Sequence, residues 1–215
     1  MCHQLPERSF FYGGYQMPVC ARDTGIYLGF LVVFAYWMIG RRYRNGNRPD
    51  VVVFTAVMIG VLAFAADALS SYAGLRETTN TLRLISGLLM GAAIGFLLLS
   101  ALSAMQEGDR KNRSFSWKDL PIIYLAILLI FLVASYDLGT GMYYVMESVT
   151  MMALLVLLMT AVLVMVSALT AKKLSDRREA YKMLAISGVA TTILLIVLWY
   201  MHHLLGPLLP PGTLG

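Results

Sequence analysis

The first 25 residues contain four side chains that could bind a metal ion. Cys2 and His3 are adjacent, and Cys20 is followed by Asp23. The segment 6–18 contains two prolines and two adjacent glycines, which disfavour a helix and favour a reversal of the chain. Such a reversal would bring the two pairs together, and two thiols, an imidazole and a carboxylate suit tetrahedral zinc. We therefore predict a zinc site at Cys2, His3, Cys20 and Asp23, which would be catalytic if an open position activated water.

The two cysteines have a second possible chemistry. Cys2 and Cys20 are the only cysteines of the chain, and two cysteines that approach each other in an oxidising compartment normally form a disulfide. A Cys2–Cys20 disulfide would close the same segment without a metal ion, and two separate thiols are a third possibility. The residue types alone leave these interpretations open.

A second polar group lies within apolar surroundings. Asp67 falls in the last third of an apolar run, and Arg76, Asn80 and Arg83 lie at the start of the next one. An ionised carboxylate at membrane depth costs a few kcal/mol unless it is paired or hydrated, so we expect Asp67 to pair with Arg83. The four residues are the candidate catalytic residues: Asp67 as a general base, and Arg76 and Arg83 as ligands for an anionic substrate such as a lipid phosphate. The alternative is a purely structural pair that fixes the hairpin.

The elements that carry these groups are predicted to be membrane-spanning helices. Hydrophobic residues make up 59% of the 215 residues and charged residues only 13%, whereas a soluble domain carries about 25% charge. A bilayer core takes roughly 20 apolar residues per helix. Apolar runs occur at about 25–40, 51–72, 82–105, 120–136, 145–171 and 183–205.

These runs predict an all-α polytopic membrane protein. We expect a six-transmembrane-helix bundle over residues 25–205, a non-helical N-terminal cap over residues 1–24, and a proline-rich tail over residues 206–215. Haem is not expected, because His202 and His203 are the only histidines in a predicted helix and stand side by side at its end.

The distribution of basic residues predicts the orientation of the bundle. Of the 17 Lys and Arg residues, 13 fall in the loops after the first, third and fifth runs, and 4 fall elsewhere. The positive-inside rule places the 13 in the cytoplasm and both termini outside it, in a multi-pass protein of the cell membrane. The charge of these inner loops is expected to be solvated, and it explains the net charge of +5 without a nucleic-acid partner.

Three glycines predict a helix-packing face. Gly87, Gly91 and Gly95 follow Arg83 at steps of four residues along the third run. Small residues at this spacing allow another helix to approach closely. Arg83 is then expected at the outer end of a tight helix contact.

Several short motifs occur in the first 100 residues. They are Cys2-His3-Gln4, Cys20-x-Arg22-x-Thr24-Gly25, Asp67, Arg76, Asn80, Arg83 and Ser86-Gly87. Together they resemble the motifs of a family of uncharacterised predicted membrane proteins, domain of unknown function 2085. In that family a further cysteine stands where this chain has Asp23, so the resemblance implies a Cys₃His metal site in the family. It implies no established activity, and the replacement by Asp23 keeps the disulfide open here.

Two functions are predicted from these features. The first is a metal-dependent membrane hydrolase, with an extracytoplasmic Cys/His/Asp zinc site above an Asp–Arg pocket. The second is a non-catalytic accessory subunit of a larger membrane complex, with a disulfide-closed cap. The lipid bilayer is the expected partner in both cases, and other membrane subunits are expected in the second.

Overall fold

The computed structural model describes residues 5–42, 45–47, 49–74, 78–105, 109–170 and 177–205. Cys2, His3, Arg76 and the tail over residues 206–215 lie outside this part of the chain. Predictions that depend on these residues therefore stay predictions.

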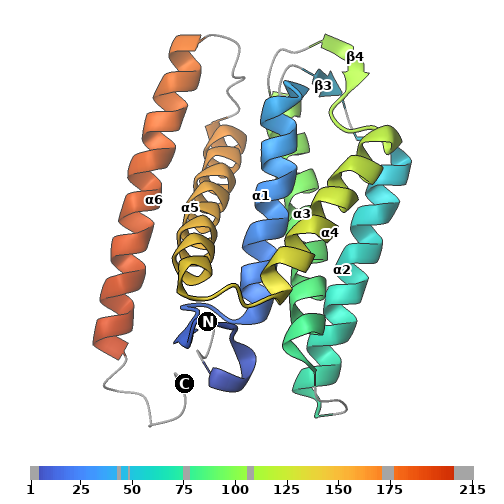
Figure 1. Ribbon diagram of the computed structural model, residues 1–215. Coiled ribbons are helices and arrows are strands. Elements are labelled where there is room, and N and C mark those ends of the chain that lie inside the picture. The colour runs from blue at the N-terminus through green and yellow to red at the C-terminus, as the bar shows by residue number, and fades with distance from the viewer. Residues whose placement is uncertain are drawn as a thin grey trace.

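The described residues form six helices, as the apolar runs predict (Figure 1). They are α1 (Ala21–Ile39), α2 (Val51–Tyr72), α3 (Asn80–Met105), α4 (Leu120–Ser135), α5 (Thr140–Thr170) and α6 (Arg177–Leu205). Helix α1 begins four residues before the predicted position, because the Cys20 side chain caps it by accepting from the Asp23 N–H at 3.5 Å. Asp23 then lies in the first turn, where a negative charge complements the helix dipole.

Four segments of the described chain are long and apolar enough to cross a membrane. They are Val51–Ser71, Asn80–Met105, Trp117–Ser135 and Thr140–Leu169. The apolar part of α6 is shorter, at Tyr181–Val197. Helix α1 has 19 residues and carries Arg22 and Asp23 in its first turn, which lowers its hydropathy.

Helix α1 occupies the middle of the bundle (Figure 1). It packs mainly against α3 and also contacts α4 and α5, while α2 lies against α3 and α6 lies against α5. Its buried side chains include Leu28, Phe30 and Val33, each at most 2% exposed. A helix that is covered by protein on several sides can hold polar residues at membrane depth, because those residues meet protein partners instead of lipid.

The N-terminal cap consists of short elements. A single 3₁₀ turn, Pro6–Arg8, precedes the strands β1 (Phe11–Tyr12) and β2 (Tyr15–Gln16), which pair in an antiparallel hairpin. The hairpin turns at Gly13 and Gly14, whose φ angles of 56° and 85° are in the left-handed region that favours glycine. The reversal expected at these glycines is therefore present. Among the described residues of the predicted cap, those at 6–8 and 21–24 are helical, because a 3₁₀ turn forms at Pro6–Arg8 and α1 begins at Ala21.

The opposite end of the bundle is held by buried charge. Strands β3 (Asn45–Asn47) and β4 (Asp109–Arg113) pair there in parallel, ahead of a 3₁₀ turn at Trp117–Asp119. Asp119 is only 2% exposed, and it accepts hydrogen bonds from the Tyr36 hydroxyl (2.6 Å) and the Ser116 N–H (2.7 Å) and pairs with Arg42. The prediction that the charges of these loops are solvated is wrong for Asp119, because the capping box of the 3₁₀ turn directs its carboxylate inward.

Candidate functional site

The contact between α1 and α3 positions the polar residues at the cap end. On α3, a Cβ added to Gly87 would lie 2.2 Å from the carbonyl oxygen of Arg22, and one added to Gly91 would lie 2.0 Å from that of Ile26. Gly95 instead meets a valine side chain of α1, at 2.9 Å. The two helix backbones are therefore in direct contact along the predicted glycine face.

Helix α1 contributes matching glycines, which the sequence-based prediction missed. A Cβ added to Gly25 would lie 2.5 Å from the carbonyl oxygen of Leu84, and one added to Gly29 would lie 2.2 Å from that of Leu88. Two four-residue glycine repeats in one chain are a signal that could have identified the partner helix. The consequence is that the first turn of α1 lies beside the first two turns of α3.

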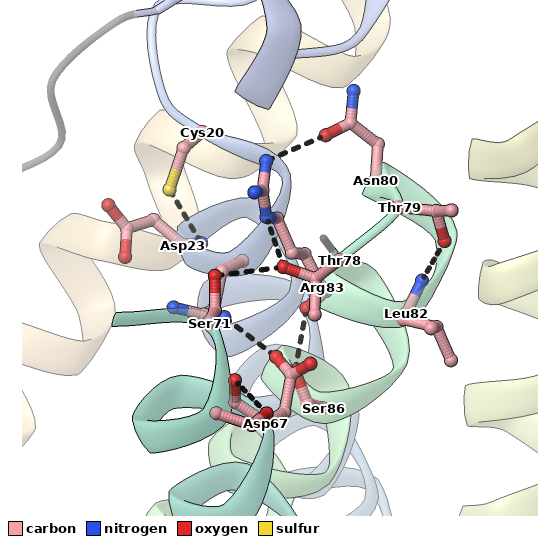
Figure 2. A network of polar contacts seen from close by, with 12 residues as sticks. Cys20, Asp23, Asp67, Ser71, Thr78, Thr79, Asn80, Leu82, Arg83 and Ser86 are labelled. Atoms are coloured by element: carbon pink, nitrogen blue, oxygen red, sulfur yellow. Dashed lines mark hydrogen bonds and ion pairs between the residues drawn. The ribbon is translucent and has the colours of Figure 1, made fainter. Parts of the chain in front are cut away.

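Asp67 lies next to this contact and is 6% exposed. Its Oδ2 atom accepts from Arg22 Nη2 at 2.7 Å and from the Ser86 hydroxyl at 2.9 Å (Figure 2). The predicted pairing of Asp67 with Arg83 is therefore wrong. The reason is the close approach of α1, which brings the side chain of Arg22 to Asp67, whereas Arg83 extends toward the loop between α2 and α3.

Arg83 is held by neutral oxygen atoms. Its Nε donates to Thr78 Oγ1 at 3.2 Å, and its Nη1 lies 3.4 Å from Asn80 Oδ1. Thr78 donates in turn to Ser71 Oγ at 3.0 Å. Figure 2 shows Arg83 with Thr78 and Asn80 at one level and Asp67 with Ser86 below them. The site thus has two polar layers, and its guanidinium groups come from different helices.

Asn80 connects the site to the cap. Its Nδ2 donates to the carbonyl oxygen of Ser9 at 3.1 Å, which places the neighbouring Arg8 close enough to act electrostatically on Arg83. Arg22 acts on Arg83 in the same way.

Positive charge is in excess in this cluster. Among the described residues, Arg8 and Arg22 place positive charge near Arg83, and Asp67 is the one carboxylate that acts on it, so these four residues together carry a surplus of two positive charges. In the described part of the chain, the Nε atom of Arg22 is buried without a hydrogen-bond partner, and its guanidinium lies 5.7 Å from the centre of the Phe64 ring. We call Arg8, Arg22 and Arg83, with their partners Asp67 and Asn80, the arginine cluster.

Two of the four predicted metal ligands, Cys20 and Asp23, lie at the edge of this cluster. Cys20 and Asp23 are partly buried at the start of α1, where the Asp23 N–H contacts Cys20 Sγ (Figure 2). Among the described residues, no group of three or more His, Cys, Asp or Glu side chains could hold a metal ion. The four-ligand set also needs Cys2 and His3, so it stays a prediction, and so does the Cys2–Cys20 disulfide.

The cap is also bound to the loop between α4 and α5. The Tyr12 hydroxyl donates to the carbonyl oxygen of Ala134 at 2.5 Å. The Gly13 N–H donates to the two carboxylate oxygens of Asp137, at 3.0 and 3.2 Å. Burial, followed by the nearby charge of Asp137, raises the pKa of Tyr12 to about 12. The cap is therefore fixed on one side by Asn80 and on the other by Asp137.

Comparisons with known proteins concern the half of the chain that contains this site. Residues 2–97 match a family model described as "Predicted membrane protein (DUF2085)". An uncharacterised protein of Methanocaldococcus jannaschii is 36% identical over 99 residues, which cover 46% of this chain and 62% of that protein. An uncharacterised protein of Methanothermobacter thermautotrophicus is 36% identical over 98 residues, which cover 45% of this chain and 83% of that protein. No solved structure matches the chain significantly.

Proposed function

The chain belongs to the DUF2085 family of predicted membrane proteins, and from this membership and the geometry of the arginine cluster we propose an anion-binding function. In this proposal the protein is a multi-pass membrane protein with both termini outside the cytoplasm. The arginine cluster lies at its outer end and binds a phosphate group. The four long apolar helices and the segregation of basic loops to the opposite end of the bundle support this placement.

The observation that carries the proposal is the unbalanced charge of the arginine cluster. Asp67 pairs with Arg22, whereas Arg83 donates to the neutral side chains of Thr78 and Asn80. A guanidinium group binds phosphate through two parallel hydrogen bonds, and partial burial strengthens this attraction. Arg83 is the principal ligand in the proposal, and Arg8 adds positive charge from the cap.

Asp67 has a different role in this proposal from the one expected from the sequence. Its carboxylate is held by Arg22 and Ser86 at 2.7 and 2.9 Å. Both donors bind the same oxygen atom, Oδ2, and the charge-assisted bond to the guanidinium fixes the two side chains together. Asp67 therefore serves to hold Arg22 in place, beside Arg83, and not as a general base.

Hydrolysis would require the zinc site predicted next to the cluster. The position of Cys20 supports this part, because its Sγ atom lies at the N-terminus of α1 and contacts the backbone of Asp23, a second predicted ligand. The other ligands would be Cys2, His3 and Asp23. Elemental analysis of purified native protein and of Cys20→Ser tests this: one zinc ion per native chain, lost in the variant, is expected. Native protein without stoichiometric zinc would end the hydrolytic part and leave phosphate binding in place.

The accessory-subunit alternative gains no specific support from the described residues.

Calorimetric titration with glycerol 3-phosphate tests the phosphate site. The purified protein in an uncharged detergent is compared with Arg83→Gln and with Lys118→Gln. Lys118 is exposed at the opposite end of the bundle, so its replacement removes the same charge away from the site. A hydrogen bond to a charged group contributes roughly 1.5–3 kcal/mol, so Arg83→Gln should weaken binding by about tenfold to a hundredfold. Equal affinities in the native protein and Arg83→Gln would refute the proposed function.

A further inference from the structure

A groove of about 490 Å³ lies between α2 and α3. Its walls include Ala63, Ala66, Leu82 and Ile85, and Asp67 and Ser86 line its polar part. The volume is within the range of roughly 300–1,000 Å³ that is common for small-molecule sites. The groove therefore offers a mostly apolar channel with one polar region.

The walls of this groove are open to the surroundings of the bundle. Leu82 and Ile85 are 40% and 38% exposed, and both belong to α3, one of the helices long and apolar enough to cross a membrane. In a membrane, these side chains would be in contact with lipid chains. A lipid could then enter the groove from the side, without leaving the bilayer.

The polar region of the groove continues into the arginine cluster. Asp67 lines the groove and accepts from Arg22 Nη2 at 2.7 Å, so the groove reaches the cluster at the Arg22 guanidinium. Ser70 also lines it and is followed by Ser71, which contacts Thr78, the partner of Arg83. A molecule in the groove would therefore meet apolar walls first, then the hydroxyl groups of Ser70 and Ser86, and then Asp67 with the Arg22 guanidinium bound to it.

We propose that this groove holds an acyl chain of a phospholipid whose phosphate is bound by the arginine cluster. Along the groove, the apolar, hydroxyl-bearing and cationic surfaces follow one another in the same order as the acyl chain, the glycerol esters and the phosphate of one lipid. The inference rests on the proposed function and adds the substrate class to it: a membrane phospholipid in place of a water-soluble phosphate. The charge surplus of the cluster favours an anionic lipid over a neutral one.

Blocking the groove separates the two parts of this assignment. Ala66→Leu places a larger side chain in the groove and leaves the arginine cluster intact. Ala104→Leu makes the same change at an exposed position of α3 outside the groove and is the matched control. Each protein, in an uncharged detergent, is titrated with dihexanoyl phosphatidylglycerol, which has acyl chains, and with glycerol 3-phosphate, which has none.

The native protein should bind dihexanoyl phosphatidylglycerol at least about tenfold more tightly than glycerol 3-phosphate, because each buried methylene group raises the affinity roughly fourfold. Ala66→Leu should lose this preference and keep its affinity for glycerol 3-phosphate, while Ala104→Leu should behave like the native protein. An unchanged preference in Ala66→Leu, or none in the native protein, would overturn the groove assignment. The result for Arg83→Gln is read separately. If this variant loses glycerol 3-phosphate binding, the phosphate site stands whatever Ala66→Leu shows. If the variant keeps that binding, the proposed function itself is refuted.

Discussion

Replacing Asp67 with Asn tests which arginine is its partner. Asp67→Asn keeps the size of the side chain and an acceptor for the Ser86 hydroxyl, but it removes the charge that balances Arg22. The side chain of Asp67 is only 7% exposed and that of Arg22 only 14%, and the distance from Asp67 Oδ2 to Arg22 Nη2 is 2.7 Å. Removing one partner of a buried pair costs about 3–5 kcal/mol, because the other charge stays buried without compensation. We expect a loss near the lower value, since the Asn oxygen still accepts a hydrogen bond.

A double-mutant cycle isolates the interaction. Arg22→Met with Asp67→Asn removes both charges, so the double variant should be more stable than the sum of the single losses predicts, with a coupling energy of about 2 kcal/mol. The parallel cycle of Arg83→Met with Asp67→Asn should give a coupling below about 1 kcal/mol. Reversible unfolding by SDS titration in mixed micelles measures the four free energies in each cycle. A larger coupling for Arg83 than for Arg22 would contradict the observed pairing and restore the one expected from the sequence.

Three further predictions concern the packing and the two ends of the bundle. Gly91→Ala should destabilise the protein by at least about 1–3 kcal/mol through overpacking, since the new Cβ would lie 2.0 Å from a backbone oxygen. The control Gly188→Ala, whose Cβ would meet only a methyl group at 4.0 Å, should leave the melting temperature unchanged or higher. Equal losses of stability in the two variants would contradict the packing argument. The free energy of unfolding should fall as the pH rises from 10 to 12, because the folded state keeps the Tyr12 proton up to a pKa of about 12. Tyr12→Phe should show a smaller fall than the native protein and be less stable below pH 10, and parallel pH profiles for the two proteins would count against this. Asp119→Asn should cost about 3 kcal/mol by leaving Arg42 near a neutral group, measured as a lower unfolding midpoint; an unchanged midpoint would mean that this charge is solvated after all.

The helices could be predicted from the sequence because apolar runs of bilayer length are a strong signal. Helix α2 begins and ends where the run over residues 51–72 does. The starts of α1 and α5 were placed too late, because polar or small residues lower the hydropathy of their first turns although these turns are helical: Arg22 and Asp23 in α1, and Thr140 and Gly141 in α5. Capping by Cys20 is a local interaction that hydropathy does not measure.

The partners of the buried charges could not be predicted in the same way. Depth along a helix suggested Arg83 for Asp67, but depth alone does not say which helix lies nearest. The glycine repeats on α1 and α3 contain that information, since two backbones can touch only where both helices lack side chains. Arg22 was absent from the candidate residues for this reason. Asp119 was misjudged because position in a loop does not reveal a capping box.

The residues of the arginine cluster all lie in the first half of the chain. The arginine cluster is built from the cap, α1, α2 and α3 only, and the match to the family ends within α3, at residue 97. The aligned segment already makes up most of the Methanothermobacter thermautotrophicus relative, which leaves little length for counterparts of α4, α5 and α6. In the proposed function, the anion-binding unit is therefore the first half of the chain. The second half packs against α1 and α3 and also holds the cap, where Ala134 and Asp137 bind Tyr12 and Gly13. Changes in α4 or its loop should therefore alter the site by loosening this packing and the cap rather than by removing a ligand.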